Sequence, residues 1–398
     1  MPIVKQLLLK GYRSYSKARA CFDNPTFLVG QNGSGKSNLA DAFMFLSEIT
    51  SLPLRAVFDR RAGIEAVRSR GPVGRPRNVG IAVKFGSTQD MREARFAFEV
   101  HALPTYGFEV IRERCEIVAA NGETHWYDRT KDSGFRTNCG LKPSIDSSAL
   151  ALPVVGGDER FAPVLKLLSG IRTYAIEPRA LRELQEPDDG TSLNRDGSNA
   201  ASVLQLLSRD YREDVTRVQQ ILEAIVPNTD KVRTVKHGNK LTVEFTQKWG
   251  ESKKAKFEAC SMSDGTLRAL GLLVAAFQKP TPAVLVIEEP EATIHPGALG
   301  SLLELIRHAS RSMQVIVTTH SPELLEERWI EDRNIRIVFW NEGTSYVAPL
   351  SDSSRRALSE HLMGAGELLK ANALQPAVDL FDDKQATAQL DLFEEKHR

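Results

Sequence analysis

Apolar and polar residues alternate over short stretches in the first 120 residues, a pattern typical of β-strands. Turn-forming residues at 86–87 and 104–107 separate three of these stretches, and this spacing favours antiparallel hairpins. We expect strands at residues 3–12, 18–22, 26–29, 79–85, 95–103 and 108–117.

Beyond this region, apolar residues recur every three or four positions, as on one face of a helix. This spacing predicts one helix that begins near Lys36 and another that ends at Phe277. It predicts further helices at residues 161–168, 198–225, 297–310, 357–369 and 377–396. Further strands are expected at residues 171–176, 231–235, 241–245, 283–287 and 314–319, the last two fully buried. Residues 121–157 lack periodicity and receive no assignment. The alternation indicates an α/β fold class with four parts, at residues 1–120, 121–260, 261–350 and 351–398.

Residues 30–37 read Gly-Gln-Asn-Gly-Ser-Gly-Lys-Ser and match the spacing of a phosphate-binding loop between a strand and a helix. The glycines permit a tight turn that aims backbone N–H groups at an anion, and the helix N-terminus adds its positive end. Lys36 is expected to reach the β- and γ-phosphates, and the Ser37 hydroxyl to bind Mg²⁺. The segment predicts a nucleoside triphosphate site. Its expected residues are Gly30, Gln31, Asn32, Gly33, Ser34, Gly35, Lys36, Ser37 and Asn38.

The apolar run 283–287 ends in Glu288 and Glu289, and a buried strand that delivers carboxylates is the expected complement of a phosphate loop. By position, Glu288 is the metal-side residue, and Glu289 is the base that deprotonates the attacking water. The next apolar strand ends at His320, which can hydrogen-bond the γ-phosphate. These residues predict a hydrolytic site.

Ser263, Asp264, Gly265 and Thr266 precede another helical pattern. A serine and a glycine that open a helix can form an anion site. On its own this signal is weak, because Ser-Asp-Gly is a common turn.

Composition narrows the possible classes of protein. The formal net charge is +1, so any surface that attracts nucleic acid has to be local. The four cysteines are widely spaced and include no C-x-x-C pair, which favours reduced thiols over disulfides or metal ligands. No apolar run is long enough to cross a bilayer, and no signal-peptide pattern is present. We expect a cytoplasmic protein that does not bind membranes.

The stretch 55–77 is rich in arginine and glycine, a composition that predicts an exposed loop and no packed element. A solvated connection and a contact with a DNA backbone or nucleotide are both open, because arginine suits phosphate. The candidate nucleic-acid residues are Arg68, Arg70, Arg75 and Arg77.

Taken in order, residues 30–37, 263–266, 284–289 and His320 resemble the motifs of an ABC-type ATPase head. The finer resemblance is to the branch that includes SMC, RecF and OLD-like proteins. It rests on Gly11–Tyr15 before the phosphate loop, on Glu288–Pro296, and on Thr318–Pro322. The resemblance implies a P-loop NTPase with a mixed sheet lobe, an antiparallel β subdomain and a helical signature lobe.

The resemblance also implies ATP and Mg²⁺ as cofactors. It implies a homodimer, or a higher oligomer, in which Ser263, Asp264 and Gly265 contact the γ-phosphate held by the partner subunit. Stand-alone ATPases of this kind commonly accompany nuclease-like proteins in anti-phage defence. We therefore expect a DNA-linked switch that controls a separate effector, such as a Toprim-like or other nuclease, and that contacts double-stranded DNA.

Two features depart from the family pattern, because Glu288 stands where most relatives carry aspartate and Asp264 replaces a glycine of the signature. The absence of a sustained heptad pattern argues against a long SMC-type coiled coil. No D-x-D pair follows Leu350, which argues against an attached OLD-type nuclease. A RecF-type repair ATPase and an ATP-gated scaffold with negligible turnover stay open, whereas the acidic segment after Pro290 argues against a transporter subunit.

Overall fold

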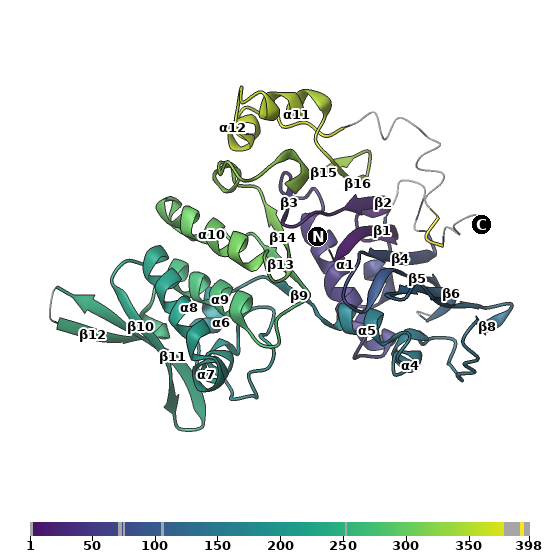
Figure 1. Ribbon diagram of the computed structural model, residues 1–398, viewed down its shortest axis with the longest axis horizontal. Helices are drawn as coiled ribbons and strands as arrows, with labels where there is room; N and C mark the ends of the chain where they lie inside the picture. The colour runs from purple at the N-terminus through teal and green to yellow at the C-terminus, as the bar shows by residue number, and fades with distance from the viewer. Residues whose placement is uncertain are drawn as a thin grey trace. The chain divides into compact units, whose positions relative to one another are not determined.

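The computed structural model describes residues 3–70, 74, 76–104, 107–250, 253–377 and 391–393. The chain folds into two compact units, each built from separate stretches of sequence. Unit 1 comprises Met1–Ile171, Glu331–Leu362 and Asn372–Arg398. Unit 2 comprises Arg172–Ile330 and Met363–Ala371. Figure 1 shows the elements of both units.

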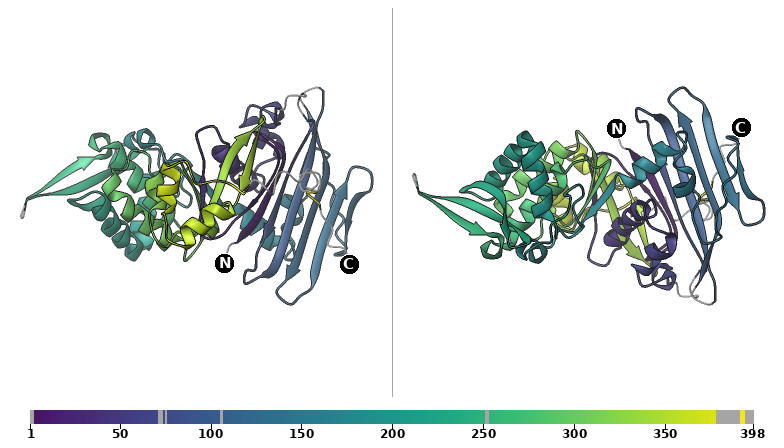
Figure 2. Two further views of the ribbon diagram at one scale, coloured as in Figure 1. Left: turned by 90° about the horizontal axis from the view of Figure 1, so that it is seen from above. Right: turned by 90° about the horizontal axis from the view of Figure 1, so that it is seen from below.

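Unit 1 contains a seven-stranded sheet whose long strands lie side by side in Figure 2. The strand order is β2-β1-β4-β5-β6-β7-β8, and every neighbouring pair is antiparallel. The predicted antiparallel hairpins are therefore present. The strands are β1 (Val4–Tyr12), β2 (Tyr15–Cys21), β4 (Asn78–Phe85), β5 (Met91–Ala102), β6 (Phe108–Ala119), β7 (Thr124–Thr130) and β8 (Gly134–Thr137).

One face of this sheet packs against α1 (Lys36–Glu48) and α5 (Ala162–Ser169). Phe45 of α1 contacts Tyr12 edge-on, with 5.9 Å between ring centroids, and stacks on Phe98 at 6.0 Å. All three rings are fully buried. Large aromatic rings bury enough apolar surface to fix the helix on the sheet, and the N-terminus of α1 is thereby held at a defined place.

The remainder of unit 1 includes a short parallel pair, β3 (Thr26–Val29) with β15 (Ile335–Asn341), and β16 (Thr344–Ala348) runs antiparallel to β15. All four residues of β3 are buried, as a strand that leads into a phosphate loop requires. The other helices of this unit are α2 (Leu54–Asp59), α3 (Ile64–Val67), α4 (Leu152–Val155) and α11 (Asp352–Ser359).

Unit 2 combines buried parallel strands with a helical lobe and a small antiparallel sheet. Strand β13 (Val284–Glu288) is parallel to β14 (Gln314–Thr319), and β9 (Ile171–Tyr174) lies next to β13. The helices are α6 (Pro178–Arg182), α7 (Ala200–Asp210), α8 (Arg212–Ile225), α9 (Asp264–Phe277), α10 (Leu299–Ala309) and α12 (Ala365–Lys370). Strands β10 (Thr229–His237), β11 (Lys240–Trp249) and β12 (Lys253–Glu258) extend away from these helices in Figure 2.

Several local predictions need correction. The stretch 55–77 is not free of packed structure, because it contains α2 and α3 and buries Arg61. Asp41 and Glu48 of α1 bond the Arg61 guanidinium, which offsets the cost of its burial. The helical run 198–225 is two helices that break at Tyr211. The predicted helix 377–396 lies mostly outside the described residues.

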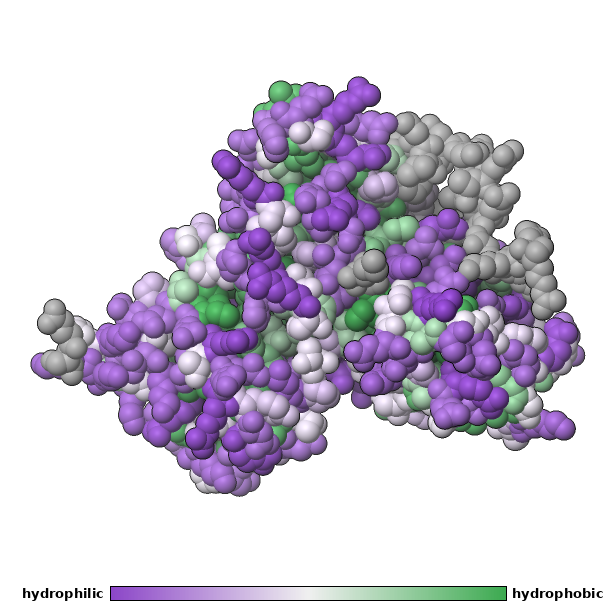
Figure 3. Space-filling model, in the orientation of Figure 1, coloured by the Kyte–Doolittle hydropathy of each residue, from purple (hydrophilic) through white to green (hydrophobic). Residues whose placement is uncertain are grey.

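Residues 121–157 contain β7, β8 and α4 despite their lack of periodicity. Among the described residues, no helix combines the length and the apolar character needed to cross a membrane. The face of the molecule drawn in Figure 3 is mostly hydrophilic, with scattered apolar residues.

Candidate functional site

The phosphate loop of unit 1 connects β3 to α1, as the sequence predicts. Gly33 and Gly35 have φ values of 78° and 114°, which side chains other than glycine rarely adopt. A Cβ atom at Gly30 would lie 2.0 Å from the carbonyl oxygen of Val338 on β15. The glycines are therefore required by backbone geometry, and the loop is held tightly against the neighbouring strand.

Lys36 is 5% exposed, and its Nζ donates to the carbonyl oxygens of Gly30 (2.7 Å) and Gln31 (3.0 Å). The lysine ammonium is thus held against the loop whose N–H groups would surround a phosphate. The buried Ser34 hydroxyl has no hydrogen-bond partner among the described residues. An unsatisfied buried hydroxyl in such a loop fits an anionic ligand that would bond it.

A hydrogen-bond network also fixes the position of the phosphate loop, and the sequence motif does not predict this network. The Ser14 hydroxyl accepts from Asn38 Nδ2 and from the Ser345 hydroxyl, each at 2.8 Å. The Tyr15 hydroxyl donates to the carbonyl oxygen of Gly35 at 3.0 Å. These contacts link α1, β16 and the β1–β2 turn, so the loop is positioned by residues far apart in the chain.

The acidic residues of unit 2 gather at the carboxyl ends of β13 and β14. Glu288 ends β13 and is 9% exposed, and its Oε1 accepts from Arg195 Nη2 at 2.6 Å. Glu289 follows in a left-handed backbone conformation, with φ of 44°. Its N–H donates to the carbonyl oxygen of Thr318 on β14 at 3.0 Å. A positive φ is uncommon for residues other than glycine, and such conformations cluster at functional sites.

His320 follows β14 and faces two carboxylates. Its Nδ1 lies 3.5 Å from Glu289 Oε1 and 3.9 Å from Glu291 Oε1. Glu291 is 9% exposed, and its Oε1 accepts from the Thr319 hydroxyl at 2.6 Å. The structure therefore brings the predicted base and the predicted switch histidine together, and it adds Glu291, which the sequence did not single out.

The predicted signature residues open helix α9. Ser263 is the N-cap, and its Oγ accepts from the Thr266 N–H at 3.2 Å. A Cβ atom at Gly265 would lie 2.6 Å from the carbonyl oxygen of Thr293, so glycine is needed for this close approach. Asp264 Oδ1 accepts from Arg182 Nη2 at 2.5 Å. Arg182 therefore offsets the negative charge of Asp264 at the start of this helix.

Arg268 connects α9 to the predicted catalytic base. Its Nη1 donates to the carbonyl oxygen of Glu289 at 3.1 Å. Burial lowers the pKa of this guanidinium, while the carboxylates of Glu291 and Glu289 oppose that shift. A movement of the N-terminal end of α9 would therefore displace the backbone of Glu289 through this hydrogen bond.

The donors present suit Mg²⁺. In unit 1, Ser37 is an exposed residue that carries a hydroxyl oxygen, and in unit 2, Glu288 carries carboxylate oxygens. Each is a hard ligand of the kind this ion prefers. Within the described part of the chain, no three His, Cys, Asp or Glu side chains form a cage for a metal.

The candidate arginines of the nucleic-acid surface differ in their surroundings. Arg68 is mostly buried, and it bonds Glu65 and the carbonyl oxygen of Pro76. Arg70 and Arg77 are exposed, and Arg75 lies outside the described residues. Arg68 thus links α3 to Pro76, and Arg70 and Arg77 are the exposed candidates for contact with a phosphate backbone.

A family model described as "AAA domain, putative AbiEii toxin, Type IV TA system" matches residues 171–326. The fold is shared with an Smc head bound to the C-terminal winged-helix domain of ScpA (TM-score 0.56, 18% identity, 88% of this chain and 98% of that one). It is also shared with an Smc head from Pyrococcus furiosus, with an extended coiled coil, bound to the C-terminal domain of ScpA (TM-score 0.55, 16% identity, 91% and 100%). No curated protein matches the sequence.

Proposed function

We propose that this chain, an ABC-type ATPase of the SMC/RecF-like branch, binds and hydrolyses ATP and uses the cycle to control a separate effector protein. The observation that carries the proposal is the convergence of Glu288, Glu289 and His320 at the ends of two parallel strands. Together with the phosphate loop of unit 1, these residues supply the groups that triphosphate hydrolysis requires.

Each residue has a distinct proposed role. Gly30–Asn38 surround the phosphates, and the Lys36 ammonium neutralises charge on the β- and γ-phosphates. Ser37 and Glu288 hold Mg²⁺, which supplies charge neutralisation to the phosphates when bound. Glu289 orients the attacking water and takes its proton. His320 donates to the γ-phosphate and so distinguishes ATP from ADP.

We further propose that two chains enclose the nucleotides head to head. Ser263, Asp264 and Gly265 then contact the γ-phosphate bound by the other subunit. The N-terminus of α9, which begins after the N-cap Ser263, supports this role, because backbone N–H groups at a helix N-terminus can bond an anion. The contact of Arg268 with Glu289 supplies a route from that interface to the catalytic base.

The effector and the setting are proposed from the comparisons. The description of the matching family names a toxin of a toxin–antitoxin system, which supports a role in defence through a partner such as a nuclease. Both Smc heads that share the fold are bound to a domain of ScpA, which supports the proposal that this chain also binds another protein. Double-stranded DNA is the proposed trigger, with Arg70 and Arg77 as contacts.

The test compares three variants by nucleotide affinity, molar mass in ATP, and steady-state hydrolysis with and without double-stranded DNA. Lys36→Ala should lose ATP binding. Glu289→Gln should bind ATP and accumulate as a dimer without turnover. Ser263→Arg should bind ATP but neither dimerise nor hydrolyse it. Normal hydrolysis by the Ser263→Arg protein would exclude the two-chain site.

The same variants, compared in cells as well as in solution, distinguish a switch from an ATP-gated scaffold. If turnover matters, the Glu289→Gln variant should lose function in cells while it keeps the ATP-bound dimer. A scaffold needs only binding, so Glu289→Gln would keep function and Lys36→Ala would lose it. Hydrolysis that rises with DNA supports the DNA-linked switch, whereas a DNA-independent rate excludes DNA as the trigger.

A further inference from the structure

The face of the seven-stranded sheet opposite α1 has an apolar hollow within a charged surface. Across strands β1, β4, β5 and β6, the residues of this face lie in three rows. These are Gln6, Lys84, Arg95 and Glu116; Leu8, Ala82, Ala97 and Arg114; and Lys10, Gly80, Glu99 and Arg112. The small residues at the centre, Gly80, Ala82 and Ala97, leave a depression beside Leu8. We call this depression the socket and define it by these four residues.

Two side chains from the C-terminal segment fill the socket. Leu392 and Phe393 are 2% and 5% exposed, and they form one buried cluster with Leu8, Ala82 and Ala97. A Cβ atom at Gly80 would lie 2.2 Å from Leu392 Cδ1, so the absence of a side chain there creates the space that Leu392 occupies. The fit depends on side-chain shape and therefore selects for particular residues.

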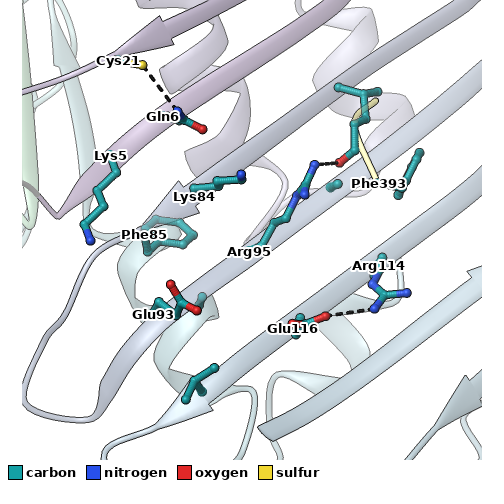
Figure 4. Close-up of a pocket in the computed structure, with 14 residues that line it drawn as sticks. Lys5, Gln6, Cys21, Lys84, Phe85, Glu93, Arg95, Arg114, Glu116 and Phe393 are labelled. Carbon is teal, nitrogen blue, oxygen red and sulfur yellow. Dashed lines mark hydrogen bonds and ion pairs between the residues drawn. The ribbon is translucent and has the colours of Figure 1, made fainter. Parts of the chain in front are cut away.

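Polar contacts fix the same segment. Arg95 Nη2 donates to the carbonyl oxygens of Leu392 (2.5 Å) and Asp391 (3.1 Å), and Figure 4 shows Arg95 beside the segment. The Arg112 guanidinium lies 4.4 Å from the centroid of the Phe393 ring. The Phe393 N–H donates to Asp391 Oδ1 at 2.8 Å. The sheet thus contacts the backbone of Asp391 and Leu392, the aromatic ring of Phe393 and the aliphatic side chain of Leu392.

The site extends beyond the three docked residues. A cavity of about 410 Å³ continues beside Leu392 and Phe393 over the ends of the strands (Figure 4). The charged residues that line it are Lys5, Lys84, Glu93, Arg95, Arg114 and Glu116. Basic groups outnumber acidic ones, so a longer peptide with acidic residues would find complementary charge.

The sequence contains the docked pattern twice. Asp391-Leu392-Phe393-Glu394-Glu395-Lys396 repeats Asp379-Leu380-Phe381-Asp382-Asp383-Lys384 with only carboxylate exchanges. The second copy includes the docked residues, and the first lies outside the described residues. Recurrence of a Leu-Phe pair between carboxylates indicates a recognition motif with acidic flanks that match the basic lining.

We propose that the socket is a docking site for a partner protein that carries an acidic segment with a central Leu-Phe pair. The chain's own residues 391–393 occupy the site and act as an internal competitor. The docked contact is short, and a partner that also fills the adjoining cavity gains contacts that Asp391–Phe393 do not make. This surface is distinct from the nucleotide site and does not depend on the proposed ATPase cycle.

The test uses the full chain with Leu380, Phe381, Leu392 and Phe393 each replaced by alanine, which removes both tethered Leu-Phe pairs and empties the socket. The probe is a fluorescent peptide of residues 387–398, measured by polarisation. If the peptide binds the emptied socket with a Kd of about 20 µM, a tethered segment at about 1 mM effective concentration should weaken its binding to the unaltered chain about fiftyfold. A peptide of residues 376–387 should bind similarly. A peptide with alanine in place of both Leu and Phe should not bind.

Gly80→Ala in the emptied background places a methyl group where Leu392 lies and should abolish peptide binding. Gly157→Ala is the matched control, because a Cβ atom there meets nothing within 4 Å. Thermal melting of both variants establishes that they fold, and Arg95→Ala provides a second route to loss of binding. The proposal is overturned if the emptied chain does not bind the peptide, or if Gly80→Ala and Arg95→Ala leave binding intact. If the unaltered chain forms a dimer and the emptied variant is a monomer, residues 391–393 dock on the socket of a second copy. That result would overturn the internal competitor.

Discussion

Arg195 is expected to compete with Mg²⁺ for Glu288. The guanidinium lies 2.6 Å from Glu288 Oε1, and a divalent ion that binds this oxygen atom has to displace it. The Arg195 side chain is 47% exposed, so solvent screens the pair, and its worth is at most about 1 kcal/mol. Since 1.4 kcal/mol corresponds to a factor of ten, Arg195→Ala should lower the Mg²⁺ concentration for half-maximal ATP binding by up to about fivefold.

The assay is a titration of Mg²⁺ against the affinity for a fluorescent ATP analogue, so it does not depend on turnover. Arg179→Ala is the matched control, because Arg179 forms an exposed ion pair with Glu183 in the same unit. In a Glu288→Ala background, Arg195→Ala should have no further effect on the Mg²⁺ midpoint. An unchanged midpoint in the single variant would refute competition, and a raised midpoint would show that Arg195 itself holds the nucleotide.

Three further predictions concern the framework of the site. Gly35→Ala should abolish ATP binding and destabilise the fold by about 2 kcal/mol or more, since it forces a side chain to φ of 114° and toward Ser345; calorimetry and urea unfolding measure both. Ser263→Ala should cost about 1 kcal/mol of unfolding free energy by loss of the α9 cap, and Ser263→Asp should restore it. Burial raises the pKa of Glu113 in the folded protein. Its contribution to the free energy of unfolding is therefore complete below the unfolded pKa of about 4.3 and is lost as pH rises through the folded pKa. Glu113→Gln should flatten this pH dependence in unfolding midpoints measured from pH 4 to 8.

The elements of the proposed nucleotide site are predictable because their signals are local in sequence. The strand, glycines and helix around Lys36 lie within one continuous stretch, and the strands that end at Glu288 and Thr319 are unbroken apolar runs. Chemistry at a strand end can therefore be inferred without knowledge of the tertiary fold. The proposed roles of these residues in catalysis remain predictions.

The partners of those residues are not predictable, because they come from distant parts of the chain. Arg195 lies 93 residues from Glu288, and Ser345 lies 331 residues from Ser14. Arg61 illustrates a different limit, because arginine-rich composition indicates exposure while carboxylates on α1 permit burial. The docking of Leu392 depends on the empty space above Gly80, which no sequence pattern reveals.

The pairing of β3 with β15 has a consequence for the order of folding during synthesis. The Asn334 side chain donates to the carbonyl oxygen of Pro25, 309 residues earlier, and Gly30 packs against Val338. Most of unit 2 is translated between these partners and can fold first as a largely continuous stretch. The phosphate loop therefore gains its contacts with β15 and β16 only late in translation, and nascent chains that end before β15 should bind ATP more weakly than the full chain.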